Sequence, residues 1–386
     1  MIRRPPRFAL RLGVLAVLVL ALNSAIALGQ VVIKVSDTVN FRVGFQLQTW
    51  ADFTQDPISQ GYQQSFFIRR VRFILGGNLA KDVSFFFQTD NPRMGNSIGT
   101  ATKALNTGFL VQDGFLEWKV FSNDQFILDA GKMLIPLTRN SLQSTSSHLA
   151  LDGGTFTFLQ VAGTQSDAGR DIGFQLKSYL VGDHLEFRGG VYDGFKTPAN
   201  AAGAGSRNAP RIAGRAVYNV FDTEKGYVPV GTNLGKRKIL SIGGGVDTQR
   251  HYLAYGGDVM VDWPIGPGDA KTGQDAITAH VDYIHWDGST SIPTLLPQRT
   301  LFTDMGYYFN AVKLQPFFRY EREDFTNTVD QVKNQQRFMA GLNYYVSAQQ
   351  MKITAAWERI MPKTQPATAT IKDLNHFVVQ LQVVYF

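Results

Sequence analysis

The chain has 386 residues, of which 44% are apolar and 18% are charged, and its formal net charge at pH 7 is +7. It contains no cysteine, which excludes disulfide bonds and thiolate metal sites. Four of the 38 basic residues and none of the 31 acidic ones lie within residues 1–29, so the rest of the chain carries 34 minus 31, or +3. A nucleic-acid-binding function therefore loses its main support.

Residues 1–29 have the pattern of a secretory signal peptide. Four arginines precede an apolar run over residues 12–22, and Ala25-Ile26-Ala27 supplies the small-x-small pattern that signal peptidases cut. As a retained transmembrane helix, the run would be too short to span about 30 Å of hydrocarbon. We expect cleavage after about residues 27 to 29 and a mature domain over residues 30–386.

The rest of the chain alternates apolar and polar residues. No later segment reaches eighteen consecutive apolar residues, so a membrane-spanning chain of this kind must close a β-sheet. A soluble β-sandwich would need a second apolar face, whereas here the opposite face is crowded with charge. We predict an all-β transmembrane antiparallel β-barrel of about sixteen strands, with eighteen as the alternative.

In chain order, the expected strands cover residues 41–48, 66–79, 83–90, 108–120, 125–134, 171–180, 185–193, 211–220, 239–248, 252–263, 277–286, 301–309, 313–323, 337–346, 351–360 and 374–386. Short turns are expected at the periplasmic end. The longest connection, residues 136–169, follows the fifth strand and is too long for an unstructured link in a compact domain. We therefore predict that it folds into the pore.

Three features need a structural explanation. Arg69 falls in the lipid-facing phase of its strand, where an arginine at the membrane midplane is costly, so we expect it at the rim or beside a bulge. Pro316 removes a donor from the ladder of a barrel that has no free edge. Aromatic residues near strand ends are expected at the membrane interfaces, namely Trp263, Trp286, Tyr307, Tyr308, Tyr344, Tyr345 and Trp357.

Six stretches together resemble one known family. They are IRRVRF (68–73), AGKMLIPLTR (130–139) with the following SLQSTSSHL, RDIGFQL (170–176), LEFRGGVYDG, GTNLGKRKILSIGGG and KLQPFFRYE. In this order they are similar to the phosphate-selective porin O and P family of Gram-negative outer membranes. The resemblance implies a sixteen-stranded, usually trimeric barrel that carries anions by passive diffusion through a basic constriction. It places the strand-two motif on Arg69, Arg70 and Arg72, and the constriction-loop motif on residues 132–139.

The alternation assigns charged side chains to the lumen. The predicted pore-lining, anion-contacting residues are Arg42, Arg70, Arg72, Arg139, Lys177, Arg188, Arg215, Arg319 and Arg337. A row of acids, Asp247, Asp258, Asp282 and Asp304, is predicted to form an acidic wall opposite a basic one. The alternative is that such basic residues have a structural role in ion pairs, with Glu117–Lys119 and Glu186–Arg188 as same-face pairs. We expect mild anion preference, because strict phosphate selection needs several cations that converge on one point.

The chain ends in FVVQLQVVYF, whose apolar row runs from Phe377 to Tyr385. A terminal aromatic residue is the usual assembly signal of outer-membrane barrels. Phe386 falls one position out of phase with the apolar row, and Tyr385 is in phase. Either the end of the strand bulges, or the barrel-assembly machinery reads the signal one residue back.

Other functions have weaker support. The sequence lacks the common hydrolase and nucleotide-binding motifs, and an outer-membrane hydrolase would have only Ser147-His148 to build on. His280, Asp282 and His285 could suggest a metal, but His285 lies in the opposite phase. A non-conducting structural or adhesive barrel is the main alternative to a porin. We expect no enzyme activity, metal or cofactor, and as partners outer-membrane lipid, small anionic or polar solutes and further copies in a homotrimer.

Overall fold

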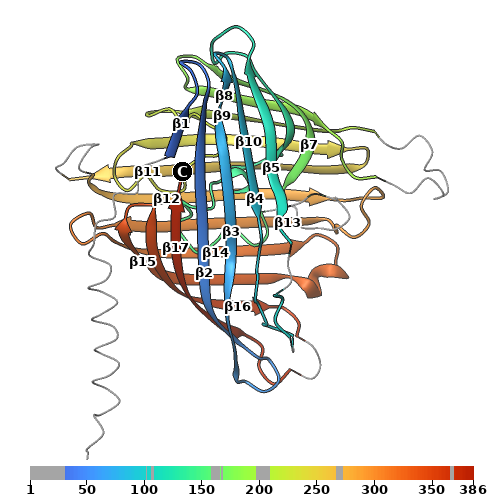
Figure 1. Ribbon diagram of the computed structural model, residues 1–386. Helices are drawn as coiled ribbons and strands as arrows, with labels where there is room; N and C mark the ends of the chain where they lie inside the picture. The colour runs from blue at the N-terminus through green and yellow to red at the C-terminus, as the bar shows by residue number, and fades with distance from the viewer. Residues whose placement is uncertain are drawn as a thin grey trace, which may run out of the picture.

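The computed structural model describes residues 31–386 except residues 101, 106–107, 158–165, 167, 197–208, 267–272 and 366–368. The expected signal peptide, residues 1–29, lies outside this range. Sixteen antiparallel strands, β2 to β17, each pair with the next, and β17 pairs with β2 from His376↔Thr54 to Tyr385↔Phe45 (Figure 1). The predicted sixteen-stranded barrel is confirmed.

The barrel strands follow the expected segments in order, but β2 is twice as long as the expected 41–48 and β3 begins before residue 66. Their bounds are β2 (Asn40–Gln55), β3 (Tyr62–Ala80), β4 (Val83–Asp90), β5 (Leu110–Lys119), β6 (Ile127–Leu134), β7 (Arg170–Leu180), β8 (Leu185–Tyr192), β9 (Arg211–Asn219), β10 (Ile239–Gln249), β11 (Tyr252–Ile265), β12 (Asp275–Asp287), β13 (Gln298–Tyr308), β14 (Leu314–Phe325), β15 (Gln335–Ser347), β16 (Met351–Pro362) and β17 (Leu374–Tyr385). Two short helices lie between strands, α2 (Arg139–Leu142) and the 3₁₀ helix η2 (Asp330–Lys333).

One additional strand was not expected. β1 (Val31–Lys34) pairs with the first residues of β2, from Val31↔Val43 to Lys34↔Asn40. The β17 ladder on β2 stops at Phe45, so β1 pairs with the part of β2 beyond the end of β17. An edge with unpaired backbone groups invites association with other chains, and β1 covers this one.

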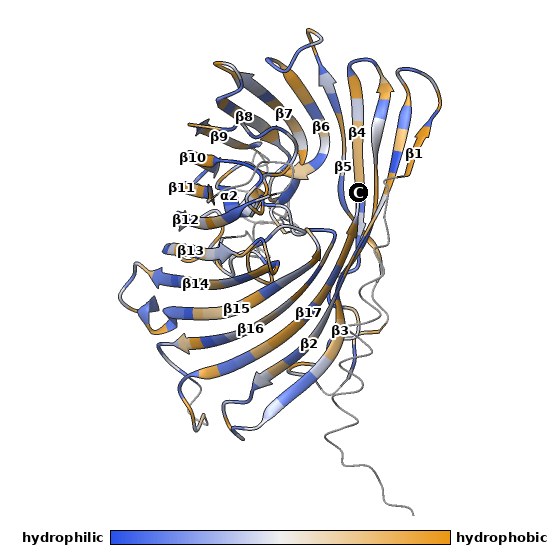
Figure 2. Ribbon diagram, turned by 90° about the vertical axis from the view of Figure 1, so that its left-hand side faces the viewer, coloured by the Kyte–Doolittle hydropathy of each residue, from blue (hydrophilic) through white to orange (hydrophobic). Residues whose placement is uncertain are grey.

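Successive side chains of a strand point to opposite faces of the sheet, and the barrel uses this to separate lipid from lumen. In β12, Val281 and Tyr283 are about 40% exposed, whereas Asp282 and Ile284 are fully buried. Figure 2 shows the resulting alternation of apolar and polar residues along the strands. In the part of the chain that the structure describes, no helix is long and apolar enough to cross a membrane.

The expected aromatic interface residues divide between the two faces. Trp263 and Tyr344 are exposed on the outside. Trp286, Tyr308 and Tyr345 are at most 5% exposed and occupy buried apolar clusters of the interior. Proximity to a strand end therefore did not predict the face, and the prediction was wrong for these three residues.

Pro316 lies near the start of β14, where one of its two ladders is interrupted. On the β15 side it is paired with Leu342. On the β13 side, the continuous ladder ends at Gly306↔Phe317, and pairing resumes only as the isolated bridge Phe309↔Leu314. Proline has no N–H to donate, and its position coincides with this gap.

The two ends of the barrel differ in their connections. The start of β2 and the end of β17 lie at the same end of the barrel. The short turns that join β3 to β4, β7 to β8 and β15 to β16 lie there too. Longer connections predominate at the opposite end, although a two-residue turn there joins β10 to β11. Residues 220–238, which join β9 to β10, are a second exception, because this long connection starts at the end that carries the termini.

The C-terminal residues separate as their phase predicts. Tyr385 forms the last pair of β17 with Phe45. Phe386 lies beyond the ladder, and its ring covers Gly44 and Gly76 and contacts the Phe86 ring at 5.9 Å between centroids. A Cβ atom at Gly44 would collide with the Phe386 ring, so the glycine makes room for it.

Candidate functional site

The long connection after β6, the fifth barrel strand, enters the barrel interior. Its first turn is α2, where the backbone N–H of Arg139 donates to Asp258 at 3.1 Å and that of Asn140 donates to Asp282 at 2.9 Å. All four residues are at most 4% exposed. Buried backbone donors need partners, and these two carboxylates of the barrel wall supply them.

Beyond α2, the described part of this connection, which we call the constriction loop (residues 136–157), follows the inner wall. Polar side chains from four strands donate to its backbone oxygens. These bonds are Gln48 to Thr145 at 3.2 Å, Gln382 to Ser146 at 2.7 Å, Lys352 to His148 at 2.7 Å and Asn343 to Leu149 at 2.7 Å. The described part of the loop therefore folds into the barrel, as the sequence predicts.

Apolar contacts secure the middle of the constriction loop. Leu149, Ala150 and Leu151 are at most 3% exposed and form a cluster with inward-facing residues of the wall. The other members are Trp50, Phe67, Phe317, Met339, Ala356 and Val378. Burial of apolar surface contributes about 25 cal/mol per Å², so these contacts stabilise the loop against the barrel wall.

Asp152 of the constriction loop binds two arginines of β3. Arg69 donates to it through Nε at 2.9 Å, Arg70 also forms an ion pair with it, and Arg70 further donates to Gln48 at 2.8 Å. Burial raises the pKa of Asp152, but the two guanidinium groups lower it by more, and the net pKa lies below its ordinary value. Two cations therefore share one carboxylate.

Arg69 reaches this site because the strand is irregular. The β2–β3 register shifts between Gln48, which is opposite Arg70, and Thr49, which is opposite Ile68. Arg69 is the extra residue at this bulge, and its side chain contacts Asp152 in the lumen. The bulge explanation is confirmed, and the arginine avoids the lipid phase.

Around Asp152 lies a cavity of about 590 Å³. Seven arginines and four carboxylates line it, a net charge of 7 minus 4, or +3, apart from His376, which lies between Asp52 at 3.1 Å and Glu358 at 2.9 Å. They are Arg69, Arg70, Arg72, Arg93, Arg170, Arg319 and Arg337 with Asp90, Asp152, Glu321 and Glu358. Two of these arginines have their carboxylate partners outside this lining, Arg170 with Asp113 and Arg319 with Asp304.

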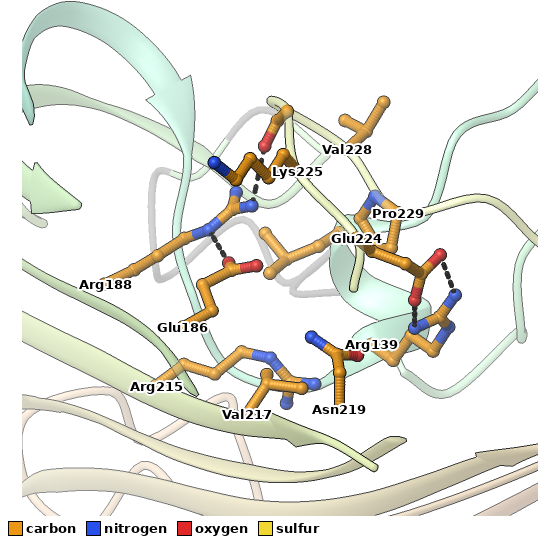
Figure 3. Close-up of a pocket in the computed structure, with 12 residues that line it drawn as sticks. Arg139, Glu186, Arg188, Arg215, Val217, Asn219, Glu224, Lys225, Val228 and Pro229 are labelled. Carbon is orange, nitrogen blue, oxygen red and sulfur yellow. Dashed lines mark hydrogen bonds and ion pairs between the residues drawn. The ribbon is translucent and has the colours of Figure 1, made fainter. Parts of the chain in front are cut away.

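The predicted pore-lining arginines fall into three groups. Arg70, Arg72, Arg319 and Arg337 line the large cavity. Arg139, Arg188 and Arg215 line a smaller cavity beside α2 (Figure 3). Of the remaining two, Lys177 lies between Glu117 at 2.5 Å and Asp129 at 3.6 Å, and Arg42 is exposed near the end of β2.

The predicted acidic wall faces the lumen, but it does not form a free field. Three of its acids pair with arginines of strands one or two positions away: Asp247 with Arg211 at 2.7 Å, Asp258 with Arg215 at 2.8 Å and Asp304 with Arg319 at 2.6 Å. The fourth, Asp282, contacts His280 at 2.5 Å and the constriction loop. The expectation of opposite acidic and basic walls was therefore wrong, because arginines neutralise three of the four acids.

Same-strand pairing was only half correct. Arg188 forms an ion pair with Glu186, as expected. Glu117, however, binds Lys177 of β7, and Lys119 binds Asp124 at 2.7 Å. Lys177 lies two strands away from Glu117, and Asp124 lies in the turn after β5, so alternation along one strand does not identify either partner.

The other sites considered do not assemble. Along β12, His280 and Asp282 are buried on the lumen side, and His285 lies in the outward phase. The described residues hold no group of three or more His, Cys, Asp or Glu side chains that could bind a metal ion. Neither ring nitrogen of the buried His148 has a hydrogen-bond partner among the described residues, so Ser147-His148 forms no nucleophile–base pair.

Sequence reasoning missed several residues of this site. Asp152 was not singled out, and neither was the connection over residues 220–238, whose Glu224 binds Arg139 at 2.6 Å. The length of this connection was the available signal. A long connection at the end with short turns is expected to fold into the barrel, where a buried carboxylate requires a partner.

Comparisons with known proteins agree with this architecture. The sequence model of the family described as phosphate-selective porin O and P matches residues 41–233, half of the chain. No curated protein matches significantly. Among solved structures, OmpF of Salmonella typhi in complex with daunomycin is similar, with a TM-score of 0.59, 11% identity and coverage of 92% of this chain and 100% of that one.

An anion-selective porin from Comamonas acidovorans has a TM-score of 0.58 and 12% identity, with coverage of 90% of this chain and 100% of that one. OmpT of Vibrio cholerae has a TM-score of 0.52 and 13% identity, with 92% and 99% covered. At these identities the likeness shows the fold alone. With the family match, it establishes that the chain belongs to the phosphate-selective porin O and P family and is an outer-membrane porin, a channel for passive diffusion.

Proposed function

We propose that this porin prefers anions mildly and that solutes contact the arginines of the large cavity. The observation that carries the proposal is the charge of its lining, seven arginines against four carboxylates. A lumen with fixed positive charge raises the local concentration of anions and lowers that of cations. Arg70, Arg72, Arg319 and Arg337 are the predicted pore residues that would meet a solute there.

The preference is mild because most of these cations are already paired. Arg72 binds Asp90 at 2.8 Å, and Arg319 binds Asp304 at 2.6 Å. A strict phosphate channel would need several guanidinium groups free to converge on one anion. The pair that shares Asp152 leaves one guanidinium charge without its own carboxylate.

Planar-bilayer recordings test this proposal. In a potassium chloride gradient, the reversal potential should shift modestly toward the equilibrium potential of chloride. Phosphate and a large organic anion should compete with chloride for the pore. Clear cation selectivity would overturn the proposed preference. A folded barrel without conductance would favour the structural or adhesive alternative.

We also propose that the chain is exported by a signal peptide over residues 1–29. The support is the basic start, the apolar run and the Ala25-Ile26-Ala27 pattern. N-terminal sequencing of protein from outer membranes should find a start within about residues 28–30. An intact Met1 in the membrane fraction would contradict it.

We propose that the C-terminal end is the signal for the barrel-assembly machinery, and that Tyr385 is its essential residue. Tyr385 completes the ladder to β2, whereas Phe386 lies past its end. Deletion of Phe386 alone should leave most membrane assembly intact, and deletion of both residues should abolish it. Equal loss in the two variants would assign the signal to Phe386.

We propose a homotrimer, on the basis of family membership. Light scattering in detergent, corrected for bound detergent, should give about three times the protomer mass. A monomer under conditions that preserve conductance would contradict the proposal.

A further inference from the structure

A second segment enters the lumen, from the end opposite to the long loops. Residues 220–238 leave β9 and join β10 at the end that carries the termini, yet Glu224, Thr232 and Leu234 are at most 8% exposed. Figure 3 shows this segment above the inward-facing side chains of β8 and β9. We call it the inner connection.

An ion pair joins the inner connection to α2. Both terminal nitrogens of Arg139 donate to Glu224, at 2.6 and 2.9 Å, and one also donates to the backbone oxygen of Val230 at 2.7 Å. Side-chain exposure is 2% for Arg139 and 10% for Glu224. The charge of Arg139 is therefore neutralised by one dedicated carboxylate, in a setting where charge pairing is strong.

Backbone contacts extend the junction along the constriction loop. The N–H of Ser144 donates to the oxygen of Pro229 at 3.0 Å, and the N–H of Gly231 donates to Ser147 Oγ at 2.9 Å. A Cβ atom at Gly231 would collide with the Gln143 side chain and with the backbone oxygen of Ser147. Only glycine allows the two segments to approach this closely.

The inner connection also reaches the far wall of the barrel. Thr232 Oγ1 contacts Thr278 of β12 at 3.2 Å and accepts from Gln315 of β14 at 3.4 Å. Its backbone oxygen accepts from Gln349, between β15 and β16, at 3.2 Å. The segment therefore crosses from β9 toward the opposite strands and does not merely line the wall beside its own ends.

We propose that the inner connection is a second constriction element, and that Glu224 is the positioning residue that neutralises Arg139 and locks the two segments together. The proposal rests on the proposed function, because it assigns a role to residues beside the conducting path. The lumen is narrowed from both ends, and the width of the path depends on the junction between the two segments. Arg139 contributes little to anion preference while Glu224 is ionised.

Glu224→Gln tests the charge. It keeps the shape of the side chain and leaves Arg139 without a carboxylate, so the reversal potential should move further toward the chloride side and single-channel conductance should rise. Asp222→Asn is the matched control, because Asp222 is an exposed carboxylate of the same connection whose Oδ2 accepts from the N–H of Lys238. The control should behave as the wild type does.

Gly231→Ala tests the junction without a change in charge. The added methyl group should separate the two segments, so conductance should rise while the reversal potential stays at the wild-type value. Adding Arg139→Gln to Glu224→Gln should return the reversal potential to the wild-type value. Heat-modifiable migration in detergent gels confirms that each variant is a folded barrel.

The outcomes separate two failures. A wild-type protein that does not conduct, or that selects cations, overturns the proposed function. If the wild type prefers anions but Glu224→Gln matches Asp222→Asn and Gly231→Ala leaves conductance unchanged, the inner connection is not a constriction element. If Glu224→Gln does not fold, an unchanged conductance of Gly231→Ala alone overturns the inference.

Discussion

Two arginine clusters in the lumen differ in the number of cations per carboxylate. In the smaller cavity, Glu224 binds one arginine, Arg139 of α2. In the large cavity, Arg69 and Arg70 share Asp152. The first arrangement is neutral and joins two segments of chain. The second also anchors a loop, but it leaves one positive charge over.

This difference separates structural arginines from arginines that set the electrostatic potential of the lumen. Truncating one partner of a buried one-to-one pair leaves an uncompensated charge, so such pairs determine whether the barrel holds together. Surplus charge in a water-accessible cavity instead biases which ions enter. Alternation in the sequence places both kinds on the same face, and only their partners distinguish them.

The largest effect is expected from Arg69→Gln combined with Arg70→Gln. The lining of the large cavity would change from +3 to 5 minus 4, or +1, so the reversal potential should lose most of its anion preference. The matched control is Arg322→Gln with Arg359→Gln, two exposed arginines of β14 and β16. An unchanged reversal potential in the lumen variant would remove the cavity from the selectivity mechanism.

Asp152→Asn should sharpen the comparison in the opposite direction. It removes the shared carboxylate and raises the lining to 7 minus 3, or +4, so anion preference should increase. Opposite shifts in the two variants cannot arise from general loosening of the loop. Shifts of the same sign would contradict a charge-based mechanism.

Asp90→Asn tests the opposite class of arginine. Arg72 and Asp90 are a one-to-one pair with side chains about 5% exposed. Loss of the carboxylate should lower the free energy of unfolding by about 3–5 kcal/mol, measured by denaturant titration in lipid bilayers. Asp330→Asn breaks the more exposed pair with Lys333 and should cost at most about 1 kcal/mol. Equal costs would show that burial does not distinguish the pairs.

The sequence predicted the barrel well because alternation with period two is a local property. The sixteen strands, the loop after β6 and the inward phase of Arg70, Arg72 and Asp258 all follow from it. The bulge at Arg69 was also within reach, since a charged residue in the lipid phase signals a local irregularity.

The partners of the inward residues could not be predicted. Arg139 and Glu224 are 85 positions apart, in two connections rather than in strands, so no periodicity relates them. Glu117 could pair along its own strand with Lys119, but it binds Lys177 of β7, which lies two strands away. Residues on the inner face of a strand can line the pore, bind the constriction loop or pack in an apolar cluster. Three-dimensional packing decides which of these roles each residue has.

The smallest expected effect concerns pH. The pKa of Asp152 lies below its ordinary value of 3.8, because Arg69 and Arg70 outweigh the effect of burial. A carboxylate with a depressed folded-state pKa stabilises the fold above its unfolded-state pKa, and this stability is lost as the pH falls through the folded-state value. The ion pairs of Asp152 should therefore persist from pH 7 down to about pH 4.

The measurement is the difference in melting temperature between the wild type and Asp152→Asn, followed from pH 7 to pH 4 in detergent. Comparing the two proteins cancels the titration of the other carboxylates, because both contain them. The difference should stay constant over this range, since neither protein changes its protonation at position 152. A difference that vanishes between pH 6 and pH 5 would mean that Asp152 titrates above its ordinary value, as an unpaired buried carboxylate does, and that the two arginines do not share it.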